Sequence, residues 1–364
     1  MYNSSIKVLN MIIDKGYKAY IVGGYPRDLY LNRKSADIDI CTNASPKELK
    51  AIFKDIILPS NAYGSVTVVY NNIRFEITTF RKEIKYENNR LPVKIKYIDN
   101  LLEDLKRRDF TINTLCMDHE GNIIDLLNGR LDLDNKVIRV VGSARYKLKE
   151  DCLRILRAIR FATILDFDLD ESLSKAIKKY GYLLKKLSYF RKKDELDKIF
   201  SSPNVLRGIK LIKELELDNY LELSNLDELV VTTSLIGIWA QLDVLNIYSF
   251  TNNERELISN INELRDKDVL DDYNLYKYGL YISSIVGEIK GINKRLITRK
   301  YNELPIYNRK DIVISVNEIC KLLKREKGGY LRDILDDLEI KIIKNEIENE
   351  KEAIEQYILN KYTT

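Results

Sequence analysis

The chain has 364 residues, is 45% hydrophobic and 32% charged, and contains no apolar run near the ~18 residues that a membrane-spanning helix needs. Its four cysteines form no CxxC pair, which argues against a zinc site or a disulfide framework and fits a reducing cytoplasm. The single histidine, His119, lies in a turn sequence and excludes metal sites built from several histidines, so carboxylates and arginines must carry any chemistry.

Residues 1–126 mix helical and strand patterns. Residues 4–16 have the pattern of an amphipathic helix and lack the apolar region and cleavage site of a signal peptide, so we expect a cytoplasmic protein. A second helix is expected at 45–55, with Ser45 as its N-cap and Glu48 at its third position. Short β-branched or alternating segments bounded by Gly, Asn or Asp predict strands at 18–24, 36–42, 65–72, 73–80 and 121–127.

Two glycines and a Pro-Arg pair precede the second of these strands. Gly23 and Gly24 let the backbone approach a ligand closely. Pro26 fits the first turn of a helix over 26–31, whose N-terminal amides would attract an anion, and Arg27 adds a charged donor. A GGxxRD sequence followed by DxD therefore predicts a site for a phosphate and a metal.

The strand at 36–42 begins Ala-Asp-Ile-Asp-Ile, which places Asp37 and Asp39 on one face and the apolar residues on the other. Two such carboxylates can hold a pair of divalent ions roughly 3.5–4 Å apart, an arrangement suited to in-line phosphoryl transfer. In the strand at 73–80, Glu76 alternates with apolar neighbours and offers a third ligand. A DxD sequence alone is usually a solvated strand edge, but the glycine turn upstream favours the metal site.

Helical patterns dominate the remainder. Residues 103–115 predict a charged helix in which Arg108 and Asp109 precede an apolar run. From residue 127 onward strand signals nearly vanish, and a chain of this length usually forms more than one core. The sequence therefore predicts an α+β fold, with a small mixed head followed by an all-α part whose clearest helices are at 150–165, 171–186 and 190–202.

The first of these helices carries three arginines on one face. At 100° per residue, Arg154, Arg157 and Arg160 lie along an arc of about 120°, and Asp151 lies one turn before Arg154. Such an arc is usually a solvated face. Because this helix follows the predicted metal-binding head, we expect the arginines to line a nucleotide pocket.

Five ordered segments match a known family: GGYPRDLYLNRKSADIDICT, FEITTFRKEIKYENNRLP, EDLKRRDFTINTL, LLNGRLDLDNKVIRVVGSARYKLKEDCLRILRAIRFA and LPIYNRKDI. Together they resemble class II tRNA nucleotidyltransferases (CCA-adding enzymes) of the DNA polymerase beta-like nucleotidyltransferase superfamily. The resemblance implies a seahorse-like architecture of four parts. These are a nucleotidyltransferase head at 1–126, a neck with a base-reading helix at 127–200, a helical body at 201–270 and a helical tail contacting tRNA at 271–364.

The resemblance also implies roles for single residues. Asp37 and Asp39 would bind two catalytic metal ions, expected to be Mg²⁺, and Glu76 would be the third catalytic carboxylate. The segment FRKKDELDKI resembles the family's neck-stabilising motif, in which Arg191 and Glu195 stand four residues apart. The nucleotide would be contacted by Gly23, Gly24 and Arg27 at the triphosphate, Arg108 and Asp109 at the ribose, Asp151 and Arg154 at the base, with Arg157 and Arg160 completing the site.

One Asp–Arg pair can recognise both cytosine and adenine. Each base presents an exocyclic amine beside a ring-nitrogen acceptor, so Asp151 can accept from the amine and Arg154 can donate to the ring nitrogen. Uracil and guanine present the reverse pattern. The pair would therefore select CTP and ATP and reject the other two nucleotides.

These features predict an enzyme that adds CCA to the 3′ end of tRNA from CTP and ATP, without a template. Its partners would be the tRNA 3′ end and the two nucleotides, with no DNA and no membrane. Residues 1–200 carry 37 Lys and Arg against 27 Asp and Glu, whereas residues 201–364 carry 23 against 28, and a basic front part suits a polyanionic partner. In the tail, residues 289–300 are the best basic candidate for contact with the tRNA body.

Three alternatives remain open. A bacterial poly(A) polymerase shares the head and neck motifs but typically carries a basic extension, whereas residues 333–364 are acidic. An enzyme that adds only CC or only A is the second. Residues 82–92 keep the length of the family's flexible loop, which we expect to switch the pocket from CTP to ATP, and this favours full CCA addition. The third is an inactive RNA-binding protein, which the intact set of Asp37, Asp39 and Glu76 argues against.

Overall fold

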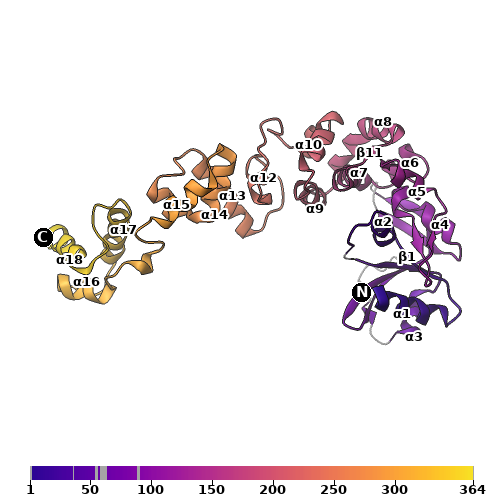
Figure 1. Ribbon diagram of the computed structural model, residues 1–364, viewed down its shortest axis with the longest axis horizontal. Helices are drawn as coiled ribbons and strands as arrows, with labels where there is room; N and C mark the ends of the chain where they lie inside the picture. The colour runs from indigo at the N-terminus through magenta and orange to yellow at the C-terminus, as the bar shows by residue number, and fades with distance from the viewer. Residues whose placement is uncertain (1, 36, 54–55, 58–63, 88–90, 364) are drawn as a thin grey trace. The chain divides into compact units, whose positions relative to one another are not determined.

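A computed structural model describes the chain except for residues 1, 36, 54–55, 58–63, 88–90 and 364. The chain forms two compact units, Met1–Glu222 and Leu223–Thr364 (Figure 1). Within the described residues, no helix combines the length and hydrophobicity required to span a lipid bilayer.

The first unit begins with a mixed seven-stranded sheet in the order β3-β4-β5-β2-β1-β8-β9. Strands β2 and β5 run parallel, and the other neighbouring pairs are antiparallel. All five expected strands are present, and each is shorter than predicted. The two-residue strands β3 and β8 are too short to recognise from the sequence. The strands are β1 (Ala19–Val22), β2 (Asp39–Thr42), β3 (Ile56–Ile57), β4 (Ser65–Tyr70), β5 (Ile73–Thr79), β8 (Cys116–Met117) and β9 (Ile123–Ile124).

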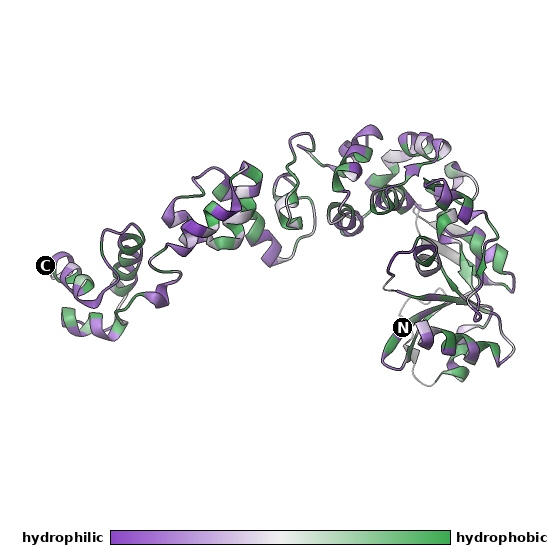
Figure 2. Ribbon diagram, in the orientation of Figure 1, coloured by the Kyte–Doolittle hydropathy of each residue, from purple (hydrophilic) through white to green (hydrophobic). Residues whose placement is uncertain are grey.

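One face of this sheet packs against two helices. Helix α1 (Tyr2–Ile13) buries Leu9 and Ile12 in a core that also contains the strand residues Ile40 and Ile77. Helix α3 (Pro46–Ile52) begins with the expected capping box between Ser45 and Glu48. Because neighbouring strand residues face opposite sides, Asp39 and Glu76 point away from this core. Figure 2 shows both hydrophobic and hydrophilic residues on the helices of this part of the chain.

A separate hairpin of β6 (Arg81–Glu87) and β7 (Leu91–Tyr97) follows the sheet. The expectation of a loop between strands at 82–92 is therefore wrong over its described part. Residues 82–87 and 91–92 lie in the two strands of the hairpin, and the remainder lies outside the described residues. Residues 93–97, VKIKY, alternate apolar and charged residues in the sequence, a pattern typical of a strand.

After the hairpin the first unit is mainly helical, as expected. The predicted helix at 103–115 is wrong, because α4 (Leu101–Lys106) ends before the arginines and only a short 3₁₀ helix (Thr111–Asn113) follows. A two-residue parallel pair, β10 (Val137–Ile138) with β11 (Asp168–Leu169), interrupts the helices. The helices are α5 (Gly129–Asp134), α6 (Ala144–Glu150), α7 (Leu153–Leu165), α8 (Glu171–Tyr180), a 3₁₀ helix (Gly181–Lys186), α9 (Tyr189–Phe200), α10 (Val205–Glu214) and α11 (Asp218–Leu221).

The described part of the second unit consists of helices joined by turns, without strands. Trp239 packs against Tyr248 and Phe250 in an aromatic cluster. Helix α14 bends at Gly279, whose φ of 72° is accessible to glycine at little cost. The helices are α12 (Leu235–Ala240), α13 (Asn252–Arg265), α14 (Asp272–Lys290), α15 (Lys294–Asn302), a 3₁₀ helix (Arg309–Asp311), α16 (Val316–Leu323), α17 (Tyr330–Ile343) and α18 (Lys351–Tyr362).

Candidate active site

The carboxylates gather on the open face of the head sheet. Asp39 of β2 lies in register with Glu76 of β5, so their Cα atoms are neighbours across two parallel strands. Asp37 is exposed two residues before Asp39, but β2 begins at Asp39, so the expectation that both aspartates lie in one strand is wrong. The alternation itself is confirmed, since Ile38 is buried and Asp39 is exposed.

The electrostatics of this face favour a cation. Desolvation of the carboxyl group by surrounding protein atoms raises the pKa of Asp39, and the negative charges of Glu76 and Asp37 raise it further, while Arg108 opposes them. Within the described residues, no three Asp, Glu, His or Cys side chains converge closely enough to hold a metal ion. Asp37, Asp39 and Glu76 nevertheless offer oxygen ligands, which Mg²⁺ prefers. That ion usually completes its coordination shell with water and substrate phosphates. The residues present therefore fit a divalent ion.

The glycine turn brings the backbone against these side chains. Gly23 has a φ of 87°, and a Cβ atom added there would lie 3.9 Å from Asp39 Oδ2 and 3.8 Å from Arg108 Nη1. Helix α2 (Gly24–Tyr30) begins two residues earlier than predicted, so Pro26 is its third residue and not its first. The Gly23 turn therefore lies next to both Asp39 and Arg108.

Arg27 is held rigidly in α2. It is buried, with only 9% of its surface exposed. Its Nη1 donates to Asn113 Oδ1 at 2.7 Å, and its Nε donates to Asp28 Oδ1 at 2.9 Å. A buried guanidinium fixed from two elements is suited to bind an anion without further ordering.

Arg108 faces the carboxylates from the turn after α4. Its Nη2 lies 3.6 Å from Oδ2 of the fully buried Asp104. Burial alone would lower the pKa of Arg108, but Cys41, Asp104 and other neighbours outweigh it and the pKa is raised. The buried Nε of Arg108 makes no hydrogen bond to any described residue, so this side chain keeps donor capacity for a ligand.

Asp109 is occupied by protein partners. Arg157 donates to its Oδ2 from Nε at 2.8 Å and from Nη2 at 2.5 Å, and the Phe110 amide donates to its Oδ1 at 2.8 Å. Burial would raise the pKa of Asp109, but Arg157 and the hydrogen bonds hold it well below the ordinary range. The structure brings Asp109 to the site chiefly as the partner of Arg157.

The predicted base-reading pair does not share a helix, so that expectation is wrong. Asp151 follows α6 in an extended conformation, and its Oδ1 accepts from the Leu153 amide at 3.0 Å at the start of α7. Arg154 is 5% exposed and donates to Lys147 O at 2.8 Å and to Glu150 Oε2 at 2.9 Å. The two side chains therefore flank the junction between α6 and α7.

Arg160 completes the arginine face of α7. Its Nε lies 3.1 Å from Oε2 of Glu195, a residue of α9 that is 3% exposed. The motif spacing placed Glu195 four residues after Arg191, whereas the structure pairs Glu195 with Arg160 of another helix. This contact ties α7 to α9.

Phe161 is a site residue that the sequence interpretation missed. The Cζ atoms of Arg27, Arg157 and Arg160 lie 5.2, 5.3 and 4.5 Å from the centre of its ring. In the sequence it reads as one more apolar residue of a helix. Its position directly after Arg160 was the available signal.

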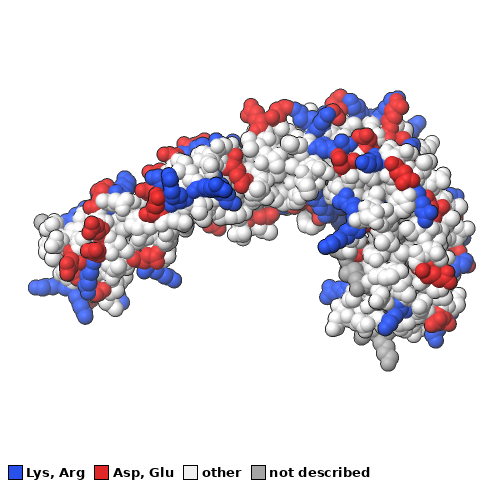
Figure 3. Space-filling view, in the orientation of Figure 1, with Lys and Arg blue, Asp and Glu red and all other residues white. Residues whose placement is uncertain are grey.

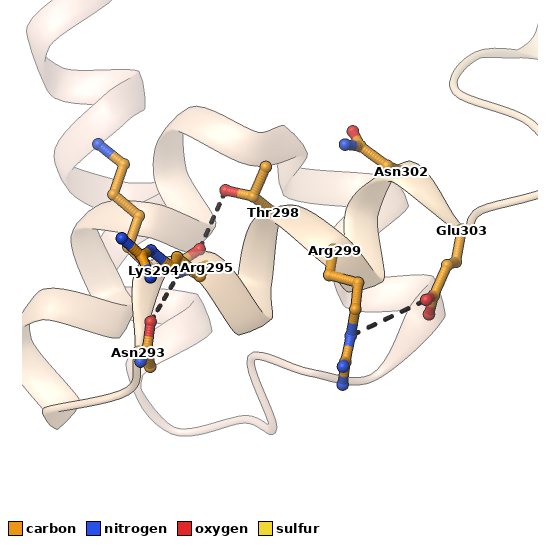
Figure 4. A pocket seen from close by; sticks show the side chains of 7 residues that line it. All are labelled: Asn293, Lys294, Arg295, Thr298, Arg299, Asn302 and Glu303. Carbon is orange, nitrogen blue, oxygen red and sulfur yellow. Dashed lines mark hydrogen bonds and ion pairs between the residues drawn. The ribbon is translucent and has the colours of Figure 1, made fainter.

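A basic groove lies in the second unit. Its volume is about 810 Å³, and α15 supplies its lining (Figure 4). Lys and Arg side chains gather over this helix in Figure 3. The groove overlaps the basic segment predicted at 289–300 and is lined by Asn293, Lys294, Arg295, Thr298, Arg299, Asn302 and Glu303.

Comparisons with protein families match most of the chain. Residues 19–139 match the poly A polymerase head domain, and residues 166–225 match a probable RNA and SrmB-binding site of polymerase A. Residues 241–358 match the putative domain 2 of tRNA nucleotidyltransferase. The family matches thus cover both compact units.

Curated relatives match over nearly the whole length. A CCA-adding enzyme of Listeria monocytogenes serotype 4b (strain F2365) is 34% identical over 98% of this chain and 98% of its own. A CCA-adding enzyme of Streptococcus agalactiae serotype V is 33% identical over 98% of this chain and 96% of its own.

Solved structures agree. The Bacillus stearothermophilus CCA-adding enzyme in complex with CTP has a TM-score of 0.85 at 27% identity, covering 99% of this chain and 97% of that one. The Thermotoga maritima CCA-adding enzyme complexed with tRNA_CCA shares the fold, with a TM-score of 0.72 at 20% identity over 98% of this chain and 95% of that one.

Proposed function

Because this chain belongs to the family of CCA-adding enzymes, we propose that it adds C, C and A to the 3′ end of tRNA from CTP and ATP, without a nucleic-acid template. The observation that carries the proposal is the placement of Asp39 and Glu76 side by side on one sheet face, against the Gly23 turn and Arg108. The activity belongs in the cytoplasm, whose reducing conditions suit the four free cysteines.

In the proposed reaction, the tRNA 3′-hydroxyl attacks the α-phosphate of the nucleotide and pyrophosphate leaves. Two Mg²⁺ ions, with Asp37 and Asp39 as ligands and Glu76 beside them, would supply activation of the hydroxyl and stabilisation of the leaving group. Arg27 and its neighbours bind and orient the triphosphate, and Arg108 contacts the ribose. Burial and ion pairing fix these side chains before the nucleotide arrives, which lowers the cost of ordering them.

Selection of the base is assigned to Asp151 and Arg154. A base placed at the junction between α6 and α7 would offer its amine to Asp151 and its ring nitrogen to Arg154. Glu150 already accepts from Arg154 at 2.9 Å, so Glu150 sets the position of the guanidinium. A position fixed in this way rejects bases whose hydrogen-bonding pattern is reversed.

Contact with the body of the tRNA is assigned to α15. Lys294, Arg295 and Arg299 are exposed along this helix, and Ile297 is fully buried beneath them. Exposed cations along one helix suit the phosphates of an RNA backbone. In this proposal, residues 271–364 bind tRNA and do not take part in the chemistry.

A poly(A) polymerase is the second candidate, because the head matches a domain of that description. The two activities separate with tRNA lacking its last three nucleotides. CTP alone should extend it by two nucleotides, ATP alone should extend only tRNA that already ends in CC, and both together should give three. Long A tails from ATP alone would establish the poly(A) polymerase, and arrest after CC with both nucleotides would establish a CC-only enzyme.

A further inference from the structure

Three arginines of the nucleotide site converge on one aromatic ring. Arg27 comes from α2 and Arg157 and Arg160 come from α7, and each places its guanidinium carbon within 5.3 Å of the Phe161 ring centre. The ring itself is 9% exposed. Segments far apart in the chain thus meet at a single buried side chain.

Such a cluster of positive charge must be stabilised before any anion binds. Burial lowers the pKa of Arg160, and the charges of Arg157 and Arg27 lower it further, while Glu195 and Asp109 oppose them. Among the described residues, each arginine pairs with a carboxylate, and the three carboxylates lie on different elements. The pairs are Arg27 with Asp28 at 2.8 Å, Arg157 with Asp109 at 2.5 Å and Arg160 with Glu195 at 3.1 Å.

Each carboxylate holds a different arginine, whereas the Phe161 ring contacts all three guanidinium groups. An aromatic face attracts guanidinium groups through its quadrupole, and this attraction is strongest where water is excluded. Phe161 is fixed in turn by an edge-on contact with Phe110, whose ring centre lies 5.7 Å away and which is fully buried. The ring therefore has one position, and the guanidinium groups are placed relative to it.

We propose that Phe161 is a positioning residue that holds Arg27, Arg157 and Arg160 as one polyphosphate-binding set. The inference rests on the proposed nucleotidyl transfer, since it names the part of the substrate that the set binds. The shared chemistry of CTP, ATP and the released pyrophosphate is a chain of phosphates. All three should therefore depend on Phe161 to the same degree, whatever the base.

The test compares variants at Phe161 with a matched control. Phe161→Leu removes the ring, Phe161→Met removes it while keeping a long apolar side chain, and Phe161→Tyr retains it. Phe53→Leu is the control, because Phe53 is a phenylalanine of the head core that is 4% exposed. For each protein we would measure KM for CTP and ATP, kcat, the inhibition constant of pyrophosphate and the midpoint of thermal unfolding, all with Mg²⁺ present.

Phe161→Leu should raise KM for CTP, KM for ATP and the pyrophosphate inhibition constant by the same factor, about tenfold, with kcat changed less than threefold. Phe161→Tyr should remain within twofold of the wild type. Phe53→Leu should lower the unfolding midpoint and leave the three constants unchanged. If Phe161→Leu fails to fold by circular dichroism, Phe161→Met carries the same expectation.

Unchanged constants in a folded ring-deleted variant would overturn the inference, and so would a rise in KM without a rise in the pyrophosphate constant. Failure of the proposed function has a different signature, because the wild type would then not complete CCA on tRNA. Calorimetric binding of inorganic tripolyphosphate needs no turnover. It would still show whether Phe161→Leu weakens polyphosphate binding about tenfold.

Discussion

The arginines of α7 and those of α15 are held in opposite ways. Arg154 is 5% exposed and bonded to carbonyl and carboxylate groups, whereas the side chain of Arg299 is 68% exposed and lies 3.9 Å from Glu303. Buried, paired cations keep one geometry and can select a substrate. Exposed cations bind phosphate wherever it lies and are screened by salt. In the proposed function, nucleotide binding and selection belong to the first helix and adhesion to RNA belongs to the second.

The largest effect is expected at the carboxylates. Asp39→Asn removes a metal ligand while preserving the shape of the side chain, so kcat for nucleotide addition should fall on the order of 1,000-fold or more. The dissociation constant for tRNA should stay within twofold, because the basic groove of α15 is unchanged. Rapid-quench incorporation and filter binding measure the two quantities. Turnover near that of the wild type would refute the assignment of Asp39.

The next largest effect is expected for Asp151→Asn, which tests selection of the base at the junction of α6 and α7. Asp151→Asn keeps an oxygen for the Leu153 amide but offers an NH₂ group where the carboxylate accepted from a base amine. Discrimination of CTP over UTP, measured as a ratio of kcat/KM, should fall about 100-fold. If the variant keeps the wild-type ratio and merely unfolds at a lower temperature, Asp151 is a structural cap.

The arrangement of the candidate site could be predicted only in part from the sequence. The faces of Asp39 and Glu76 follow from the two-residue period of strands, and the capping box of Ser45 and Glu48 follows from local spacing. The pair of Asp109 with Arg157 spans 48 positions and brings together elements that only the tertiary fold makes neighbours. Spacing along the chain cannot show such a contact.

The end of helix α4 and the role of Phe161 are two features that the sequence did not predict. The helix at 103–115 was expected because its composition is helical, yet α4 ends at Lys106. Arg107 forms an ion pair with the buried Asp104 at 2.8 Å, which draws the turn onto the helix end. Phe161 was missed because its environment includes Arg27, which belongs to a distant segment of the chain. The contact between Arg27 and the Phe161 ring is a tertiary one, which spacing along the chain does not reveal.

A third effect concerns stability and its dependence on pH. Asp109→Asn should lower the free energy of unfolding at pH 7 by about 2 kcal/mol, because Arg157 loses its charged partner. The folded-state pKa of Asp109 lies below the unfolded one, so its stabilisation is present above the ordinary Asp pKa and is lost as the pH falls toward the folded value. Urea unfolding from pH 7 to pH 3 should show the difference between wild type and variant constant above the ordinary Asp pKa and narrowing below it. A difference independent of pH would contradict the ion pair.

The smallest effect is expected on the α15 surface. Arg295→Glu with Arg299→Glu should weaken tRNA binding roughly tenfold at low salt and reduce the salt dependence of the binding constant, with kcat unchanged. Arg332→Glu is the matched control, because its side chain is 85% exposed on another helix of the same unit. Equal losses in the control and the double variant would show that charge alone matters and that α15 is not the contact.

The most direct test is to sequence the 3′ ends made by the wild-type protein. Transfer RNA ending before its CCA would be incubated with all four nucleotides at equal concentration and Mg²⁺, and the added nucleotides would be read molecule by molecule. The account predicts one product, CCA, with addition stopping after the A. Added U or G, a run of A, or an end at CC in most molecules would contradict it.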